Sequence, residues 1–180
     1  QDGGAEIWAM TINEIRKKNP TTTLETLIPD FKANPNQIQK IIEVKPEIVS
    51  HNLETVRRLT KKVRIQAKYD RSLKTLQILK EGGMKTKSGI MLGLGETENE
   101  IIETMHDLRE VSVSVLTMGQ YLQPTVKHYP LDRYVHPDEF AELKSIGLSK
   151  GFLIVASSPL TRSSYHADED FSKMKKLRDK

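Results

Sequence analysis

The segment at residues 87–96, Lys-Ser-Gly-Ile-Met-Leu-Gly-Leu-Gly-Glu, has the clearest potential for ligand chemistry in this chain. Gly89, Gly93 and Gly95 surround a short apolar run, and the segment ends at the carboxylate of Glu96. Glycine lets a backbone approach a ligand closely or adopt a positive φ, and α/β proteins bind cofactors where a strand turns into a helix. Taken alone, a tight connection without a ligand is the simpler explanation of these residues.

Polar side chains also follow the other apolar segments that we interpret as strands. Because the carboxyl ends of parallel strands meet at one edge of a sheet, these side chains should form a shared polar rim. The segments concerned are residues 29–31 (Pro-Asp-Phe), 51–55 (His-Asn-Leu-Glu-Thr), 120–125 (Gln-Tyr-Leu-Gln-Pro-Thr) and 162–166 (Arg-Ser-Ser-Tyr-His).

Each of these polar residues also has an explanation that involves no ligand. Asn52 could cap a helix beginning at Leu53, and Asp30 could serve turn geometry alone. His51 is better explained as a packed, hydrogen-bonded histidine than as a metal ligand, because no second histidine has ligand spacing. Gln120 could orient a substrate but is a poor acid–base catalyst, and Arg162 could be an ordinary surface cation.

Helical and strand periods alternate along the chain. A capping box at residues 97–100 favours a helix opened by Glu96. The alternation predicts a parallel sheet with helices outside it, either open or closed into a barrel. The predicted helices cover about residues 5–18, from 34 through 42, 53–60, 72–80, 98–109 and 137–149, and the predicted strands cover 24–28, 47–50, 88–92, 112–120 and 152–156.

The composition is that of a globular protein with one domain. The 180 residues include no cysteine, which excludes disulfides and thiolate metal sites built from this chain alone. No apolar run approaches the roughly 20 residues that span a bilayer. The net charge is +4, and five basic residues lie near the end of the chain, at 173, 175, 176, 178 and 180. We interpret this tail as a solvated face rather than a nucleic-acid site. We therefore expect no nucleic-acid or membrane partner, and divide the chain into residues 1–167 and a tail at 168–180.

Seven segments, in order along nearly the whole chain, resemble those of the lipoyl synthases, members of the radical S-adenosylmethionine superfamily. His-Asn-Leu-Glu-Thr and Arg-Ser-Ser-Tyr are the most specific of the matching motifs. The matching segments are residues 2–5, 51–55, 69–73, 87–96, 119–124, 134–137 and 162–167.

The resemblance implies a partial βα barrel of the radical S-adenosylmethionine type. The chain would lack the first strand, most of the second, and the upstream region that holds the family's cluster-binding cysteines. Such enzymes use a 5′-deoxyadenosyl radical to insert two sulfur atoms, at carbons 6 and 8, into a protein-bound octanoyl group. Their cofactors are S-adenosylmethionine and two four-iron–four-sulfur clusters, one of which is consumed as the sulfur source.

The resemblance also implies roles for individual residues. Some should contact S-adenosylmethionine, the second serine of the Arg-Ser-Ser-Tyr segment should bind the consumed cluster, and its neighbours should face the substrate or support the ligands. The expected cofactor contacts are Asn52, Glu54, Gly89, Met91, Gly93, Glu96 and Gln120, the cluster ligand is Ser164, and the neighbours are Arg162 and Tyr165.

The implied partners are an octanoylated lipoyl carrier domain or H protein, and a reductant such as ferredoxin or flavodoxin. The implied location is the cytoplasm for a bacterial protein, which we favour, and the mitochondrion or plastid for a eukaryotic one. Without cysteine ligands, the chain by itself should be inactive. Its uncovered sheet edge should cause aggregation or partial disorder, which a sharp monomer peak in size-exclusion chromatography would contradict.

Two departures from the family pattern make the local backbone uncertain. Ala33 stands where the family usually has glycine, and residues 158–161 read Ser-Pro-Leu-Thr rather than Gly-Pro-Leu-Val. Two other function classes remain open: a different βα-barrel ligand-binding protein with an anion at Gly93–Glu96, and a non-catalytic adaptor. The carboxylate of Glu96 argues against the anion site.

Overall fold

The computed structural model describes residues 2–164. The predicted role of Tyr165 and the predicted tail at 168–180 therefore lie outside the described residues.

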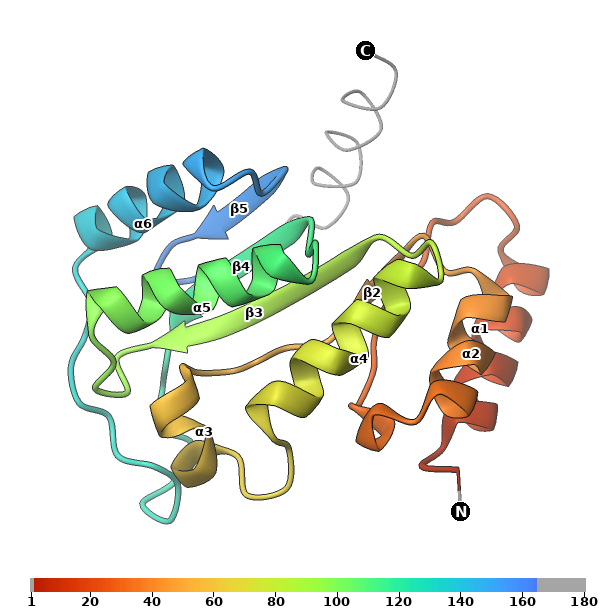
Figure 1. Cartoon of the computed structure of the whole chain (residues 1–180), viewed down its shortest axis with the longest axis horizontal. Coiled ribbons are helices and arrows are strands. Elements are labelled where there is room, and N and C mark those ends of the chain that lie inside the picture. Colours follow the sequence, from red (N-terminus) through yellow and green to blue (C-terminus); the bar gives the residue numbers. More distant parts are fainter. Residues whose placement is uncertain (1, 165–180) are drawn as a thin grey trace.

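The described chain alternates helices and strands as the periodicity predicts (Figure 1). Five strands and their order along the chain are confirmed. The elements are α1 (Ala5–Lys18), β1 (Glu25–Leu27), η1 (Phe31–Ala33), α2 (Pro35–Val44), β2 (Ile48–Ser50), α3 (Arg57–Val63), α4 (Tyr69–Glu81), β3 (Thr86–Leu92), α5 (Glu98–Glu110), β4 (Val115–Gln120), α6 (Pro137–Ser149) and β5 (Ile154–Ser157).

The strands form one parallel sheet in the order β1-β2-β3-β4-β5. Consecutive strands are neighbours throughout, as in a βα barrel, but β1 and β5 are not paired with each other, so the sheet stays open. β3 and β4 have the longest register, from Lys87 opposite Val115 to Leu92 opposite Gln120. The parallel α/β fold predicted as a partial barrel is confirmed.

Local sequence signals set the starts of three helices. Asn34 caps α2 by accepting a hydrogen bond from the backbone of Asn36, with Pro35 at the first helical position. Thr97 and Glu100 form the predicted capping box of α5. His136 and Pro137 open α6, and the predicted bounds of that helix are confirmed.

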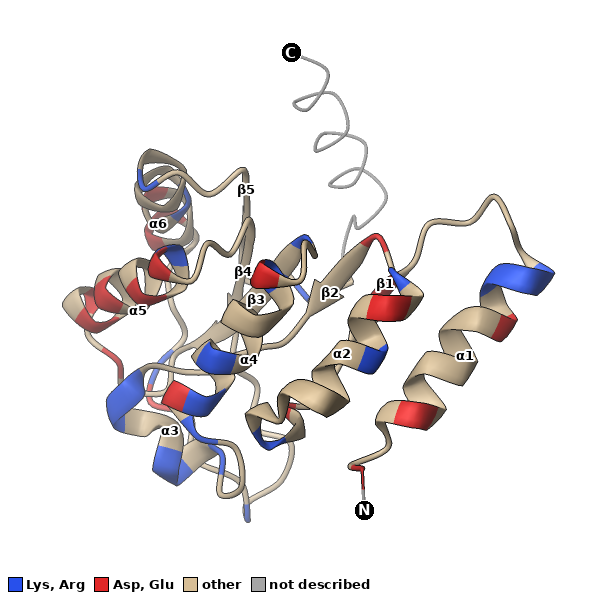
Figure 2. Cartoon of the chain, turned by 45° about the vertical axis from the view of Figure 1, so that its right-hand side comes forward, with Lys and Arg blue, Asp and Glu red and all other residues tan. Residues whose placement is uncertain are grey.

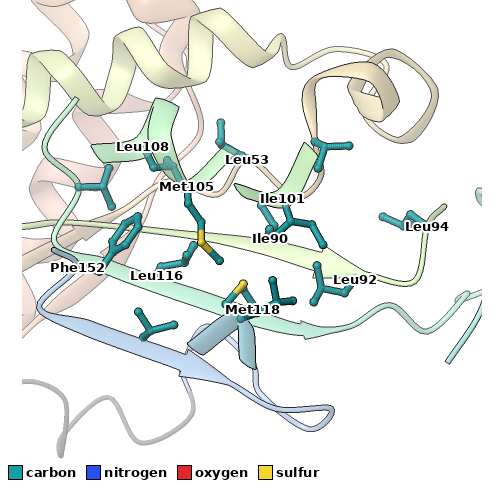
Figure 3. Packing of buried hydrophobic residues seen from close by; sticks show 14 of the residues in the cluster. Leu53, Ile90, Leu92, Leu94, Ile101, Met105, Leu108, Leu116, Met118 and Phe152 are labelled. Atoms are coloured by element: carbon teal, nitrogen blue, oxygen red, sulfur yellow. The ribbon is translucent and has the colours of Figure 1, made fainter. Parts of the chain in front are cut away.

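The outer face of the sheet packs against helices and carries the main apolar core (Figure 3). Ile90 and Leu92 on β3, and Leu116 and Met118 on β4, alternate with residues of the opposite face. They lie in one cluster with side chains of α5, including Met105, which is fully buried.

The inner face is different in composition. Near the amino ends of the strands, Ile48, Val115 and Ile154 form a small apolar cluster. Further along β3, the residues that alternate with the core positions are Lys87, Gly89 and Met91. Charged residues otherwise lie mainly on the helices, with basic residues along α3 and acidic residues along α5 (Figure 2).

Three predicted boundaries are wrong. The helix predicted from Leu53 begins at Arg57, because residues 51–54 continue beside β3 instead of coiling. The strand predicted from Ser112 begins at Val115, since Ser112 has a φ of 59° and belongs to a turn. Glu96 does not open a helix, because α5 begins at Glu98 with Thr97 as its cap.

The departure at Ala33 coincides with an unusual backbone. Phe31, Lys32 and Ala33 have φ values of 42°, 56° and 54°, a left-handed turn that closes through a hydrogen bond from Ala33 N to Asp30 O. Residues other than glycine adopt this left-handed backbone conformation at a cost in free energy. Glycine would therefore suit position 33 better than alanine does.

Candidate functional site

A pocket of about 270 Å³ lies at the carboxyl ends of the strands. It collects residues from the end of β2, from the inner face of β3 and β4, and from the segment that follows β5. Its lining residues are Asn52, Glu54, Gly89, Ile90, Met91, Thr117, Gly119, Gln120, Leu122, Thr161, Arg162 and Ser163. The predicted polar rim is thus confirmed in part: four of its five segments contribute to this concave site, whereas residues 29–31 do not line it.

The segment after β2 forms one wall of the pocket through an irregular extension of the sheet. Ser50 pairs with Lys87, but Glu54 pairs with Ile90, so the segment has one more residue than β3 over this stretch. Glu54 N donates to Gly89 O at 2.9 Å, and Met91 N donates to Glu54 O at 2.8 Å. The extra residue gives Glu54 a φ of 66°. Such bulges redirect side chains next to functional sites.

Arg64, directly after α3, binds the backbone of the segment that forms this wall. Its Nη1 donates to Asn52 O at 2.7 Å and to Leu53 O at 3.3 Å. Burial lowers the pKa of this guanidinium, with the nearby carboxylate of Glu54 opposing the shift. The partly buried guanidinium of Arg64 therefore binds two backbone carbonyl oxygens of residues 51–54. These carbonyl oxygens are then not free to accept hydrogen bonds within a helix.

The side chain of Asn52 lies in the pocket with its Oδ1 buried and without a hydrogen-bond partner among residues 2–164. The cap of α3 is Val56, so the alternative that Asn52 caps a helix is wrong. A buried polar atom without a partner is rare and costs free energy. Asn52 therefore presents a free acceptor to whatever occupies the pocket.

Two glycines keep the pocket open. A Cβ at Gly89 would lie 2.5 Å from Thr117 Oγ1 and 3.2 Å from Asn52 Oδ1. A Cβ at Gly119 would lie 2.2 Å from the carbonyl oxygen of Thr161. Neither position has room for a side chain, so these glycines allow close approach of neighbouring backbone and of a ligand.

Gln120 lines the pocket, but its side-chain amide is engaged by the protein. Its Nε2 lies 3.0–3.1 Å from the carbonyl oxygens of Leu92, Tyr121 and Arg133, and its Oε1 accepts from Val135 N at 2.9 Å. Gly93 makes room for this network with a φ of 98°. Gln120 thus positions the loop at residues 121–136 and has little capacity left for a ligand.

Glu96 lies beyond the end of β3, outside the residues that line the pocket. Its carboxylate accepts hydrogen bonds from Gly93 N at 2.6 Å and Leu94 N at 2.8 Å. It borders a smaller cavity between α5 and α6. In the described structure Glu96 shapes the glycine turn from within.

The segment after β5 closes the opposite wall. Thr161 is buried, while Arg162 and Ser163 line the pocket. Ser164 follows directly and is exposed. Tyr165, predicted to face the substrate or support the ligands, lies outside the described residues.

Glu54 and Arg162 are the two charged residues among those that line the pocket, one a carboxylate and the other a guanidinium cation, and they come from opposite walls. Arg162 Nη1 donates only to its neighbour Thr161 O, at 2.8 Å, and neither side chain has an ion-pair partner among residues 2–164. The pocket therefore offers one negative and one positive group to a ligand.

The neighbouring His51 and Asp30 have structural roles. His51 is almost fully buried, with Nδ1 2.9 Å from Ile28 O and Nε2 2.9 Å from Ser72 Oγ. Burial lowers its pKa, with the hydrogen bond to Ile28 opposing the shift. Asp30 accepts from Lys32 N and pairs with Arg71. The interpretation of His51 as a packed histidine is confirmed.

Sequence reasoning missed three groups that shape the site: Thr117, Gly119 and Arg64. Thr117 and Gly119 stand two residues apart in a buried strand, and small or polar residues at alternate positions are a signal that could have located them. The role of Arg64 depends on a contact between distant segments, which no local pattern reveals.

Within residues 2–164, no group of three His, Cys, Asp or Glu side chains could hold a metal ion. The described residues therefore do not fit an iron–sulfur cluster by themselves. None of the helices in this part of the chain is long and apolar enough to cross a lipid bilayer.

Known proteins with similar sequences are lipoyl synthases. The chain is 59% identical to lipoyl synthase from Christiangramia forsetii over 94% of its own length and 58% of that protein. It is 56% identical to mitochondrial lipoyl synthase from Nematostella vectensis, over 94% and 58% of the two chains. The resemblance to lipoyl synthases is confirmed, and the chain spans a little more than half the length of these relatives.

The fold has a solved counterpart in methylornithine synthase, which superposes with a TM-score of 0.62 at 14% identity, over 97% of this chain and 62% of that one. The sequence profile of the radical SAM superfamily matches residues 2–108, more than half of the chain. This chain therefore belongs to the radical SAM superfamily.

Proposed function

We propose that this chain is the part of a lipoyl synthase that binds S-adenosylmethionine and presents the segment that contacts the sulfur-donating cluster. The observation that carries the proposal is the pocket itself. Residues from the His-Asn-Leu-Glu-Thr segment, the glycine-rich segment and the Arg-Ser-Ser segment, far apart in sequence, line one cavity.

The residues of the pocket fit S-adenosylmethionine. This molecule combines an adenine, a ribose, a sulfonium and an amino acid, so it brings hydrogen-bond donors and charges of both signs. The free Asn52 Oδ1 would accept from one of its hydroxyl or amino groups. Glu54 would attract its positive groups and Arg162 its carboxylate. Gly89 lines the pocket without a side chain that would clash with Thr117 Oγ1 and Asn52 Oδ1.

S-adenosylmethionine, when bound and reduced, supplies a carbon-centred radical that removes hydrogen from unactivated carbon atoms. The residues of this chain would bind the cofactor, fix its orientation and exclude water. Such chemistry depends on positioning more than on a titrating base. The absence of a catalytic acid–base pair among the lining residues is compatible with that requirement.

The cluster ligands require groups that these 180 residues lack, since the chain contains no cysteine. We propose that thiolates outside this sequence hold both clusters, and that Ser164 contributes one oxygen ligand to the consumed cluster. Ser164 is exposed beside the pocket, where such a ligand would be available. A serine oxygen suits iron less well than thiolate, in keeping with a cluster that is taken apart. The 180-residue chain alone is proposed to be inactive.

The complete reaction and its partners are also proposals. The enzyme would act as a sulfurtransferase that inserts two sulfur atoms into an octanoyl group on a lipoyl carrier domain or H protein, with ferredoxin or flavodoxin as reductant. The identity to lipoyl synthases supports this assignment. A cytoplasmic location is proposed on the identity to the bacterial relative, with the mitochondrion as the alternative that the Nematostella vectensis relative supports.

Calorimetric titration tests the proposal in the complete gene product reconstituted with iron and sulfide. S-adenosylmethionine should bind, and Arg162→Gln should weaken binding of S-adenosylmethionine more than binding of adenosine, which lacks the carboxylate. Lys127→Gln, on the exposed loop at residues 121–136, is the matched control and should bind both like the wild type. Binding of inorganic phosphate without binding of S-adenosylmethionine would instead favour an unrelated anion-binding βα barrel.

A further inference from the structure

Lys87 is a buried lysine that the proposed chemistry does not use. It lies on the inner face of β3 and is 1% exposed. Its Nζ lies 3.0 Å from Glu25 Oε1 and 3.1 Å from Glu25 Oε2 on β1, two strands away. Ser50 on β2, the strand between them, donates to Glu25 Oε1 at 2.7 Å. The ammonium makes one more hydrogen bond, to the carbonyl oxygen of Ser163.

Stability of the sheet does not explain a lysine at this position. The neighbouring inner-face residues nearer the amino ends of the strands, Ile48, Val115 and Ile154, are apolar and pack together. Strands of parallel sheets are usually apolar on both faces. A buried ion pair is often no more stabilising than apolar residues of similar volume, because both charges lose their hydration. Lys87 is therefore better explained by its hydrogen bond to Ser163, in the segment after β5.

The segment after β5 is held differently before and after Thr161. Up to Thr161 the segment is held by its own contacts: Ser158 N donates to Met118 O, and Gln120 N donates to Pro159 O. Within residues 2–164, one hydrogen bond connects residues 162–164 to a helix or strand of the fold. It runs from Lys87 Nζ to Ser163 O. Arg162 donates only to Thr161 of the same segment.

We propose that Lys87 is a positioning residue, whose buried side-chain nitrogen latches residues 162–164 to the inner face of the sheet through Ser163 O, with Glu25 as its ion-pair partner. The latch places Arg162 and Ser163 in the pocket and sets where Ser164 emerges. The assignment of a role to Ser164 rests on the proposed function, whereas the latch itself does not.

Three variants of the complete gene product separate the latch from general stability. Lys87→Met removes the donor but leaves the half-buried Glu25 carboxylate without its ion-pair partner. The double variant Lys87→Met with Glu25→Gln removes the latch and keeps the charges balanced, so it remains informative if the single variant fails to fold. Ser50→Ala is the matched control, because it removes a hydrogen bond of the same polar cluster and leaves the contact with Ser163 in place.

The first measurement is limited trypsin digestion without any ligand, with the cleavage sites identified by mass spectrometry. Cleavage after Arg162 is compared with cleavage after Lys127, which lies on an exposed loop and serves as the internal reference. Loss of a hydrogen bond from a charged donor should raise relative cleavage after Arg162 by about tenfold in the double variant. In Ser50→Ala it should stay within about twofold of the wild type. Unchanged cleavage in the double variant, or an equal rise in Ser50→Ala, would overturn the latch.

The second measurement is the number of sulfur atoms inserted for each S-adenosylmethionine cleaved. A displaced Ser164 should lower this ratio in the double variant, while Ser50→Ala keeps the wild-type ratio. A double variant with loosened residues 162–164 and an unchanged ratio would contradict the link to Ser164. If the wild-type protein cleaves no S-adenosylmethionine, the proposed function fails, and the digestion still decides whether the latch exists.

Discussion

The two faces of β3 carry residues of different kinds and make different contacts. On the outer face, Ile90 and Leu92 belong to a dry apolar core that also includes side chains of α5 (Figure 3). On the inner face, Lys87 holds an ion pair, Gly89 leaves room, and Met91 lines the pocket. One strand thus serves stability with one set of alternate residues and ligand binding with the other.

The contrast indicates that the inner face is not optimised for stability. The unpartnered Asn52 Oδ1, the positive φ of Glu54 and the buried Lys87 are each costly arrangements. Asn52 and Glu54 line the pocket, and Lys87 binds the carbonyl oxygen of Ser163, which also lines it. Such a grouping is expected where function and not packing has selected the residues. The outer face, in contrast, has few features that a generic α/β core would lack.

The largest effect should follow from a deletion in the outer face. Met105→Ala empties a fully buried position in the core and should lower the free energy of unfolding by about 2–5 kcal/mol. Urea denaturation measures the change, and calorimetry of the folded protein should give an affinity for S-adenosylmethionine within about twofold of the wild type. Val126→Ala, at a residue 94% exposed, is the control and should be neutral. A large loss of affinity in Met105→Ala would erase the distinction between the faces.

The inner face should respond in both properties. Gly89→Ala brings a methyl group against Thr117 Oγ1, which should cost about 1–3 kcal/mol of stability and weaken S-adenosylmethionine binding at least about tenfold. The double variant with Thr117→Ala relieves the clash. It should regain most of the stability, while the added methyl group still occupies the pocket and binding stays weak. Recovery of both properties together would show that Gly89 is needed for packing alone.

Stability should depend on pH through Glu100, which lies at the start of α5 and on neither face of β3. The hydrogen bond from Arg58, helped by that from Thr97 N, lowers the pKa of Glu100 to about 2. Because the folded pKa lies below the usual value of about 4.5, the contribution to stability is present above about pH 4.5 and is lost as the pH falls toward 2. The pair is partly exposed, so the effect is small. Urea denaturation should show Glu100→Gln less stable than the wild type at pH 7, with the gap narrowing by pH 2.5; a constant gap would contradict this.

The smallest effect concerns backbone strain in η1, which does not line the pocket. Ala33 has a φ of 54°, so Ala33→Gly should stabilise the fold by about 1 kcal/mol. Thermal denaturation measures this as a raised Tm, and S-adenosylmethionine affinity should not change. Ala9→Gly in the interior of α1 is the opposite control and should destabilise by a similar amount. A destabilising Ala33→Gly would mean that the left-handed turn is not strained.

Much of the fold and part of the site could be predicted from the sequence. Periodicity located all five strands, and proline and capping residues fixed the bounds of α6 and the start of α2. The polar rim followed from the rule that the ends of parallel strands meet. The prediction of a helix at Leu53 was wrong because the spacing of Leu53, Val56 and Leu59 fits a helix, whereas pairing of Glu54 with Ile90 holds the first of them in an extended segment.

Other features depend on partners that a sequence does not name. Gln120 and Glu96 have the polarity of ligand-binding residues, but their side chains meet backbone groups of the folded loops. Whether a polar side chain faces a ligand or the protein is decided by loop conformation. Lys87 was read as part of a motif, and its contact with Ser163, 76 residues later, appears only in the folded chain.

Asn52→Ala, measured for both stability and ligand affinity, tests most directly whether this pocket binds S-adenosylmethionine. Because Asn52 Oδ1 has no partner in the described part of the chain, its removal should leave the free energy of unfolding within about 0.5 kcal/mol of the wild type or raise it. Affinity for S-adenosylmethionine should fall at least about tenfold. A variant that loses stability but binds the cofactor with wild-type affinity would contradict the assignment of this pocket as the cofactor site.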